Sequence, residues 1–519
     1  MAKTTLLTLL LLGSAPAQEI SSNRIRAHVE FLSSDLLEGR GTGERGGELA
    51  TAYLASQLAI AGAKPGSGDG WFQPVTLTGV ATQPGSKLAA GSLTFQFPQD
   101  FVGQTRARKP EVSLNAEMIF VGHGISAPEF QWDDYRGAEV KGKTVVLFTN
   151  EPQSKDPALF GGPALTYYGR WSYKFEEAAR RGAAAALIIH TNSTAGYGWD
   201  VVRNSWGREE AQASESGLVF AGWLHQEAGA RLLAQAGHKL DDLLKRAGAR
   251  GFRAIPLKQT LEAAIQSNFR QIPVRNVAGR IPGSDPVLAS EAIVFAAHWD
   301  HLGIDRAANG DGIYNGAVDN ATGCAMLLEI AQAWAALEPK PRRTALFLFT
   351  AAEEAGLLGA EYYAANPIVP LAKTALVLNF DSFYPFGRAS DVVVNGAERI
   401  TFWPQVQSIA QRFRLTISPD PRPEQGSFFR SDHFPFAKAG VAAFSVSQGN
   451  TYLTDRDAKR ERQREYSAWH YHRPSDEYRA DWDFSGMEEM ARFGMALGQA
   501  AASGPKKAEW VTATARGRK

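Results

Sequence analysis

The pattern of hydrophobic and polar positions changes twice along the chain. In residues 24–66, apolar positions recur every three or four residues on both sides of a glycine-rich stretch, which predicts two amphipathic helices joined by a turn. From about residue 72, short alternating runs such as FQPVTLTGV and SLTFQFP predict strands. From about residue 271, continuous apolar runs alternate with helical stretches. The chain is therefore expected to combine a β-rich unit with an α/β unit.

The last part of the chain has the pattern of a sheet that is buried on both faces. Its strands are predicted by four apolar runs, AIVFAAHWDH, RTALFLFTAAEE, TALVLNFD and VAAFSVS, and TGCAMLLEIAQAWAAL predicts a helix after the first of them. This alternation is typical of an α/β fold with a mixed, mostly parallel sheet sandwiched by helices. In such folds ligands bind beyond the carboxyl ends of the strands, where the polar residues of this part gather.

The β-rich part, from about residue 90 to 265, contains a match to a nucleotide-binding loop. Residues 137–144, GAEVKGKT, fit the pattern GxxxxGK[ST] letter for letter. A phosphate-binding loop needs a helix directly after it, whereas this segment leads into VVLF, a predicted strand. We therefore interpret the match as a tight turn that enters a strand.

Composition and charge exclude two classes of protein. The 519 residues are 44% hydrophobic and 21% charged, which is ordinary for a globular chain with a sizeable core. Lysine and arginine number 55 and aspartate and glutamate 54, so the chain lacks the basic excess of a nucleic-acid-binding protein. Beyond the N-terminus, no stretch approaches the ~20 apolar residues of a membrane span.

The two ends of the chain differ from the rest in composition. Lys3, the apolar run LLTLLLL and the small residues Ala15–Ala17 predict a signal peptide at residues 1–17, cleaved near Ala17, and hence a secreted or periplasmic protein. A buried N-terminal helix is the alternative. Cys324 is the only cysteine, which excludes an intramolecular disulfide. The basic, aperiodic residues 504–519 are expected to form a disordered tail.

Histidines and carboxylates follow the predicted strands of the α/β part. HWDH ends the first strand, NGAVDNATG precedes a helix, Glu353 and Glu354 follow the second strand, and NFD ends the third. Each group alone has an ordinary explanation, because acids favour helix N-termini and aspartate is a common N-cap. Together they suit zinc or a similar divalent ion, and a two-metal site needs about five such ligands.

These motifs carry a resemblance to a known family. HWDHLG, NGAVDNATGCAMLLEIA, TAAEEAGLLGAEYY, LNFDS and YHRPSDEY resemble the signatures of M28-type zinc exopeptidases. FVGHGISAPEFQWDDYRGAEVKGKTVVLF and YGRWSYKFEEAARRGAAAALIIH resemble the protease-associated domain inserted in many of these enzymes. The resemblance implies the N-terminal part of a catalytic domain at 18–90, a protease-associated domain at 91–265 and the rest of the zinc peptidase domain at 266–503.

The resemblance also implies a role for each residue of the site. Two zinc ions are expected, one held by His298 and Asp381, the other by Glu354 and His472, with Asp319 bridging both. Glu353 would be the general base, and Asp300 would orient the imidazole of His298. Tyr471 would donate its phenol to the developing oxyanion, unless it is only an aromatic packed beside a ligand.

Several neighbouring residues leave alternatives open. Many relatives carry an acid where this chain has Val318, a position that we interpret as non-ligating. His301 is expected to be structural, and His470 competes with His472, which the YHxPxD context favours. Asp432 and His433 match a family motif near the rim of the active site, as supporting or pocket-lining residues. The charged segment 455–466 is either a solvated helix face or a substrate-gating lid.

The expected function is that of a secreted aminopeptidase acting on peptide substrates. A carboxypeptidase or dipeptidase of the same family would need arginines for the substrate's terminal carboxylate, and Arg388, Arg422 and Arg430 lie in suitable loops. A non-catalytic, receptor-like peptide-binding protein would have lost the ligands, which are all present here. Glutaminyl cyclases, a further alternative, generally use one zinc and lack the inserted domain. No nucleic-acid partner and no membrane span are expected.

Overall fold

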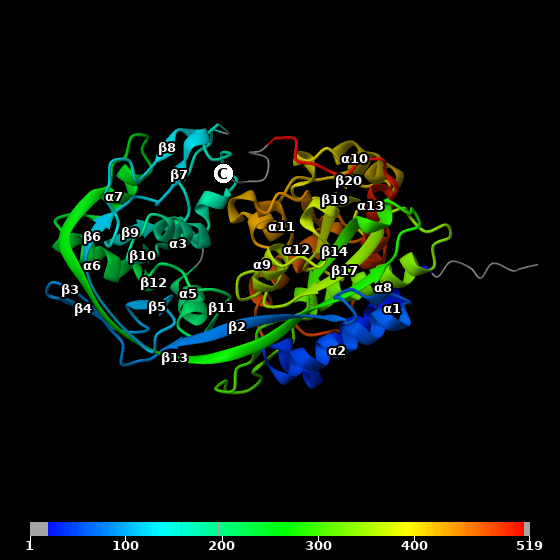
Figure 1. Ribbon diagram of the computed structural model, residues 1–519, viewed down its shortest axis with the longest axis horizontal. Helices are drawn as coiled ribbons and strands as arrows, with labels where there is room; N and C mark the ends of the chain where they lie inside the picture. The colour runs from blue at the N-terminus through cyan, green and yellow to red at the C-terminus, as the bar shows by residue number, and fades with distance from the viewer. Residues whose placement is uncertain (1–18, 157, 196–197, 513–519) are drawn as a thin grey trace, which may run out of the picture.

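The protein has two lobes that lie side by side (Figure 1). The computed structural model describes residues 19–156, 158–195 and 198–512, so the expected signal peptide and residues 513–519 of the tail lie outside the described residues. We call residues 19–82 and 266–512 the α/β lobe and residues 83–265 the β-rich lobe. Two antiparallel strands, β2 (Phe72–Thr82) and β13 (Ile255–Ile281), connect them. Because β13 is one strand of 27 residues that pairs in both lobes, continuous hydrogen-bonded backbone joins the two.

The α/β lobe is built on a sheet whose central strands are buried on both faces. Strand β14 (Ala292–His298) lies between β17 (Thr344–Thr350) and β18 (Thr374–Phe380), all three parallel, and β21 (Ala443–Gln448) extends the sheet. Every residue of the first three strands is buried, and alternate residues of β14 enter different cores, Phe295 on one face and Val294 on the other. The mixed, mostly parallel sheet that the continuous apolar runs predict is confirmed.

Helices cover both faces of this sheet (Figure 1). One face packs against α1 (Ser22–Leu32), α2 (Arg45–Ile60), α8 (Thr322–Ala335), α10 (Trp403–Arg412) and α13 (Ser485–Ser503). The other packs against α9 (Leu358–Ala365) and α11 (His433–Lys438). The N-terminal helices α1 and α2 are those predicted from residues 24–66. Helix α12 (Arg456–Trp469) lies at the surface, with Tyr466 as its one buried residue.

The β-rich lobe has a second sheet with its own helices. Strands β6, β9, β10 and β12 are parallel, and β5 pairs antiparallel with β12. Residue 144 begins β9 and no helix follows it, so the GAEVKGKT segment lacks the helix that a nucleotide-binding loop requires. That this lobe is a protease-associated domain stays a prediction. Its elements are β3 (Lys87–Ala90), β4 (Leu93–Phe95), β5 (Phe101–Thr105), β6 (Glu111–Phe120), β7 (Ser126–Ala127), β8 (Trp132–Asp133), β9 (Thr144–Phe148), α3 (Trp171–Arg180), β10 (Ala185–Ile189), α4 (Asn192–Ala195), α5 (Trp199–Trp206), β11 (Glu210–Gln212), β12 (Phe220–Leu224), α6 (Gln226–Gln235) and α7 (Leu240–Ala247).

The chain after α13 packs on the α/β lobe. The indole of Trp510 donates to the carbonyl oxygen of Val441 at 3.0 Å, and its backbone pairs with Ile400. Residues 504–512 of the expected disordered tail therefore pack on this lobe, because a half-buried aromatic side chain anchors them near their end. The sequence pattern does not show this anchor, since one tryptophan in a basic segment has no periodicity.

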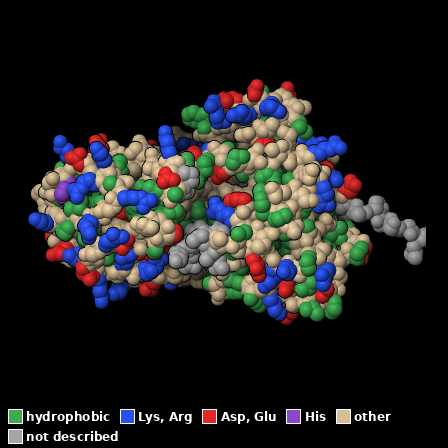
Figure 2. Space-filling model, turned by 90° about the horizontal axis from the view of Figure 1, so that it is seen from above, with side chains coloured by type: hydrophobic (Ala, Val, Ile, Leu, Met, Phe, Trp, Pro, Cys, Tyr) green, Lys and Arg blue, Asp and Glu red, His purple; other side chains and the backbone are tan. Residues whose placement is uncertain are grey.

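The surface carries both charges in mixture. On the face shown in Figure 2, basic and acidic side chains are interspersed over both lobes, in keeping with the near-equal counts of 55 and 54. Among the described residues, no helix is both long enough and apolar enough to cross a membrane.

Candidate metal centre

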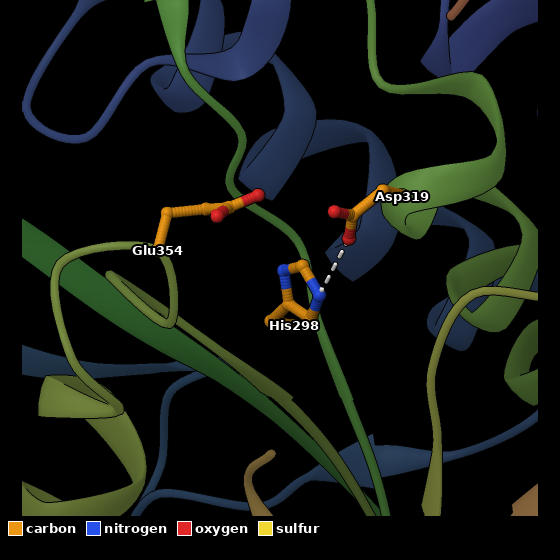
Figure 3. A group of neighbouring side chains, drawn as sticks. All are labelled: His298, Asp319 and Glu354. Atoms are coloured by element: carbon orange, nitrogen blue, oxygen red, sulfur yellow. Dashed lines mark ion pairs between the residues drawn. The ribbon is translucent and has the colours of Figure 1, made fainter. Parts of the chain in front are cut away.

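The predicted ligands meet at the carboxyl ends of the central strands. His298 is the last residue of β14, Glu354 follows the end of β17, and Asp319 lies in the irregular turn that precedes α8. One potential ligand atom from each of these three residues lies within 4.8 Å of the others. Figure 3 shows the three side chains turned toward a common point. Parallel strands bring their ends to one edge, so residues far apart in sequence can share a metal.

Five side chains form two sets of three that share Asp319. In the first set, His298 Nε2 lies 3.2 Å from Asp319 Oδ1 and 3.3 Å from Asp381 Oδ1. In the second set, His472 Nε2 lies 3.1 Å from Asp319 Oδ2 and 3.1 Å from Glu354 Oε2. Each oxygen of Asp319 thus belongs to a different set. One imidazole and two carboxylates per set are ligands that zinc prefers, so the donor sets fit two metal ions bridged by Asp319.

The charged groups of the site shift the pKa values of one another. Burial alone would lower the pKa of His298, but the carboxylates of Glu353 and Asp381 raise it well above its usual value. Burial would likewise raise the pKa of Glu354, yet the neighbouring His472 lowers it to about 2. Glu354 is thus held in the ionised form in which a carboxylate binds a metal.

Asp300 contacts the site through both its backbone and its side chain. Its carboxylate lies 3.9 Å from His298 Nδ1, whereas its main-chain carbonyl oxygen lies 3.2 Å from the same nitrogen. The carboxylate instead accepts hydrogen bonds from the backbone N–H groups of Glu353 at 3.1 Å and Glu354 at 3.4 Å. Asp300 therefore orients the imidazole through its backbone and fixes the two glutamates through its side chain.

The two glutamates have different surroundings. Both oxygens of Glu354 are engaged, one with His472 and the other with His301 Nδ1 at 2.6 Å. The carboxylate of Glu353 has no hydrogen-bond or ion-pair partner among the residues that the structure describes, and burial raises its pKa well above the usual value, as do Glu354 and Asp381. The adjacent residues therefore separate into one side chain in the ligand cluster and one that is free.

Other buried side chains hold the ligands in place. Ser431 Oγ donates to Asp381 Oδ2 at 2.6 Å. Asp476 accepts hydrogen bonds from the backbone N–H of Asp319 at 3.2 Å and from the phenol of Tyr466 at 2.6 Å. His301 was predicted to be structural, and its contact with Glu354 gives it that role inside the site. Sequence reasoning missed Ser431 and Asp476, although both lie in motifs of the resemblance, SDHFPF and YHRPSDEY.

The remaining candidates lie around this centre. The ring of Tyr471 stacks on that of His472 with centroids 3.9 Å apart, and the residue is 41% exposed. His470 Nδ1 faces the hydroxyl of Ser475 at 2.9 Å instead of the cluster, and Val318 contributes only a backbone N–H to Asp476.

Residues 432 and 433 are fully buried, so they support the site from behind and do not form its rim. Asp432 accepts a hydrogen bond from Thr350 at 2.5 Å, and the ring of His433 packs on that of Phe428.

The structure also shows the surroundings of Arg388, Arg430 and the charged helix α12. Arg388 forms an ion pair with Glu489, whereas Arg430 directly precedes Ser431 at the site and has no ion-pair partner among the described residues. Helix α12 exposes nearly all its charged residues, as a solvated face would.

Comparison with known proteins gives a consistent picture. Residues 276–495 match the family model of Peptidase family M28, the family whose signatures the motifs of this part resemble. Leupeptin-inactivating enzyme 1 of Streptomyces exfoliatus is 28% identical over 178 residues, which are 34% of this chain and 36% of that protein. The chain thus matches only about a third of the length of this curated relative.

Solved structures resemble nearly the whole chain. An aminopeptidase from Aneurinibacillus sp. strain AM-1 has a TM-score of 0.54 at 18% identity and covers 95% of this chain and 96% of its own. A zinc aminopeptidase of Bacillus subtilis, BSAP, has a TM-score of 0.47 at 16% identity, covering 92% and 95%. The first of these likenesses confirms the overall fold.

Proposed function

We propose that the protein is a secreted aminopeptidase that hydrolyses N-terminal residues from peptides with two zinc ions. The proposal rests on the position of Asp319. Its two carboxylate oxygens face two different histidine–carboxylate pairs. A structural aspartate needs only one such partner, whereas a ligand that bridges two metals needs both. When bound, zinc polarises a carbonyl group and lowers the pKa of a water molecule.

Glu353 is the proposed general base. Its carboxylate is the only one of the adjacent pair without a protein partner among the described residues, and its backbone is fixed by Asp300. It would take a proton from the attacking water and return it to the leaving amine, a role that needs a carboxyl group whose pKa lies above its usual value. Tyr471, next to the ligand His472, would donate its phenol to the oxyanion.

The preference for a free N-terminus is supported by the carboxylates of the centre. Asp319, Glu353, Glu354 and Asp381 gather oxygen atoms in one place, and carboxylates beside the metals suffice to bind a free α-amino group. The solved structures of similar fold include proteins described as aminopeptidases. Arg430 supports the second candidate, a carboxypeptidase or dipeptidase, because it is an unpaired cation beside the site.

Substrate assays separate these candidates. Aminoacyl anilides with a free amine, N-blocked peptides and dipeptides with C-terminal glutamate should be compared before and after chelation and after zinc is restored. Cleavage of the free-amine substrates alone, lost on chelation and regained with zinc, is expected. Cleavage only of N-blocked substrates would refute the aminopeptidase assignment, and a purified protein without tightly bound divalent metal would favour a peptide-binding receptor.

Export is proposed from the first 17 residues alone. Expression of the full chain in a bacterial host, followed by mass analysis of the N-terminus, tests it. A mature protein that begins at Gln18 in the periplasm or the medium is expected, and an intact Met1 in the cytosol would refute export.

A further inference from the structure

A buried arginine from the N-terminal segment lies directly behind the metal centre. Arg40 is only 1% exposed, although arginine is rarely buried without an acidic partner. Among the residues that the structure describes, no carboxylate lies within the 4.0 Å limit of an ion pair with its guanidinium. All of its hydrogen bonds go to main-chain carbonyl oxygens instead. This arrangement needs an explanation beyond the pairing of charges.

One acceptor is the carbonyl oxygen of Leu32 at the end of α1, and the others belong to the two loops that carry the proposed metal ligands. Nε donates to the carbonyl oxygen of Trp299 at 2.8 Å, directly after the ligand His298. The two terminal nitrogens donate to the carbonyl oxygens of Asn315 at 2.6 Å and Gly316 at 2.8 Å, and more weakly to that of Asp319 at 3.5 Å. One planar group therefore holds the loop of His298 and the loop of Asp319 at a fixed separation.

The backbone around Arg40 is shaped to admit this side chain. Arg40 has φ 48°, a left-handed conformation that a non-glycine residue rarely adopts, and its carbonyl oxygen accepts from the N–H of His301 at 3.3 Å. A Cβ on the preceding Gly39 would lie 2.5 Å from the carbonyl oxygens of Gly303 and Tyr314. The segment is thus pressed against the ligand loops, and strained backbone of this kind persists where the surroundings hold it.

The charge of Arg40 also bears on the site. Burial lowers the pKa of the Arg40 guanidinium, while the charges of Asp476, Asp319 and Asp300 act in the opposite direction. Because carbonyl oxygens leave a guanidinium with its full positive charge, Arg40 offsets part of the repulsion among the clustered acids. It does so from behind the ligands, so it does not compete for their oxygens.

We propose that Arg40 is a positioning residue of the metal centre. It fixes the spacing between His298 and Asp319 and offsets the negative charge of the ligand cluster, so that zinc binds to a site that is already assembled. The N-terminal segment before β2 is therefore part of the zinc site, although it supplies no ligand. This inference rests on the zinc centre of the proposed function.

The test compares zinc affinity in folded apoprotein. Arg40→Met removes the donors and the charge, while Arg40→Lys keeps the charge but not the planar array of donors. Arg343→Met is the control, because Arg343 is also 1% exposed and bonds the carbonyl oxygens of Ala501 and Gly504, yet lies at the opposite end of β17 from the site. It differs from Arg40 in that its Nε also forms an ion pair with Glu291 at 2.7 Å. Zinc dissociation constants are measured by competition with a chromophoric chelator, after circular dichroism has shown that each variant is folded.

We expect Arg40→Met to weaken zinc binding by about 10- to 100-fold, the usual effect of losing a group that orients ligands. Zinc binding should be weakened less in Arg40→Lys, and this variant provides the test if Arg40→Met does not fold. Arg343→Met should bind zinc as the wild type does. Wild-type affinity in both Arg40 variants, or equal loss in the Arg343 control, would overturn the positioning role. A wild-type protein that binds no zinc would instead overturn the proposed function.

Discussion

Replacing Glu353 by glutamine tests the division of labour between the two adjacent glutamates. The change keeps the shape of the side chain and removes only its ability to carry a proton. The backbone N–H of residue 353 would still donate to Asp300, at 3.1 Å in the wild type. No side-chain partner among the described residues is lost, so the zinc ligands should keep their positions.

The size of the effect follows from the surroundings of Glu353. Burial, with the charges of Glu354 and Asp381, raises its pKa well above the usual value, which favours the uncharged form that glutamine resembles. Stability should therefore change by no more than about 0.5 kcal/mol. Loss of a general base typically costs about 10²- to 10⁴-fold in rate, or about 3 to 5 kcal/mol in the barrier.

The assay measures both the turnover and the zinc content of each variant. Glu353→Gln should retain the zinc content of the wild type and lose kcat, while KM for an aminoacyl anilide changes little. Glu354→Gln is the matched control, since Glu354 Oε2 lies 3.1 Å from His472 Nε2 in a ligand set. That variant should lose zinc affinity, and excess zinc should restore part of its activity.

Two results would refute this reasoning. If Glu353→Gln kept more than about a tenth of wild-type kcat, another group would be the base, because loss of a general base costs at least about 10²-fold. If it lost zinc as readily as Glu354→Gln, residue 353 would be a ligand and the roles within the pair would be wrong.

Three further changes have distinct expected outcomes. Elemental analysis should show that Asp319→Ala loses both zinc ions and that Asp381→Ala loses only one. The reason is that, of these two residues, Asp319 belongs to both ligand sets and Asp381 to one; equal zinc content in the two variants would contradict a bridging role for Asp319. Tyr471→Phe should keep its stacked ring and zinc but lose about 10²- to 10³-fold in kcat, and unchanged kcat would show that Tyr471 is only a packed aromatic. Burial lowers the pKa of His123 to about 3 in the folded protein, whereas an unfolded histidine has a pKa of about 6.5. Between these two pH values only the unfolded state binds a proton at His123. The contribution of His123 to the free energy of unfolding is therefore fully present above about pH 6.5 and falls as the pH decreases toward 3. Between pH 7 and 5, the free energy of unfolding measured in urea should therefore fall by about 2 kcal/mol less in His123→Gln than in the wild type. The same pH dependence in both proteins would contradict a lowered pKa of His123.

The α/β sheet and the place of its site could be predicted because both depend on local pattern. Strands that are apolar at every position, such as β14 and β17, must be covered on both faces, which fixes the class of the fold. Their carboxyl ends share one edge, so polar residues that directly follow them are brought together. His298, Glu354 and Asp381 all directly end or follow such strands, and the structure gathers them.

The supporting residues could not be predicted, because their roles depend on burial and direction. The motif HWDH places Asp300 two residues after His298, but nothing in it indicates that the carboxylate of Asp300 bonds the backbone of Glu353 and Glu354. An arginine in a glycine-rich turn normally faces solvent, so nothing in LEGRG indicates that Arg40 is buried. The glycines give one signal in retrospect, since Gly39 allows the close approach of the segment to the ligand loops.

The three proposed carboxylate ligands are held in two different ways, and the difference follows from how many of their oxygens remain for contacts with the protein. Glu354 and Asp381 each face a histidine with one oxygen and are fixed through the other, by His301 and by Ser431. Asp319 has both oxygens in ligand sets, so its position must be set through its backbone.

The backbone contacts of residue 319 supply this restraint. Its N–H donates to Asp476, and its carbonyl oxygen lies 3.5 Å from the guanidinium of Arg40, which also bonds the preceding Gly316. A side chain that bridges two cations cannot also be anchored by hydrogen bonds to its own oxygens. The residues that orient it are therefore expected to bond to its main chain, as Asp476 from the C-terminal part and Arg40 from the N-terminal segment do.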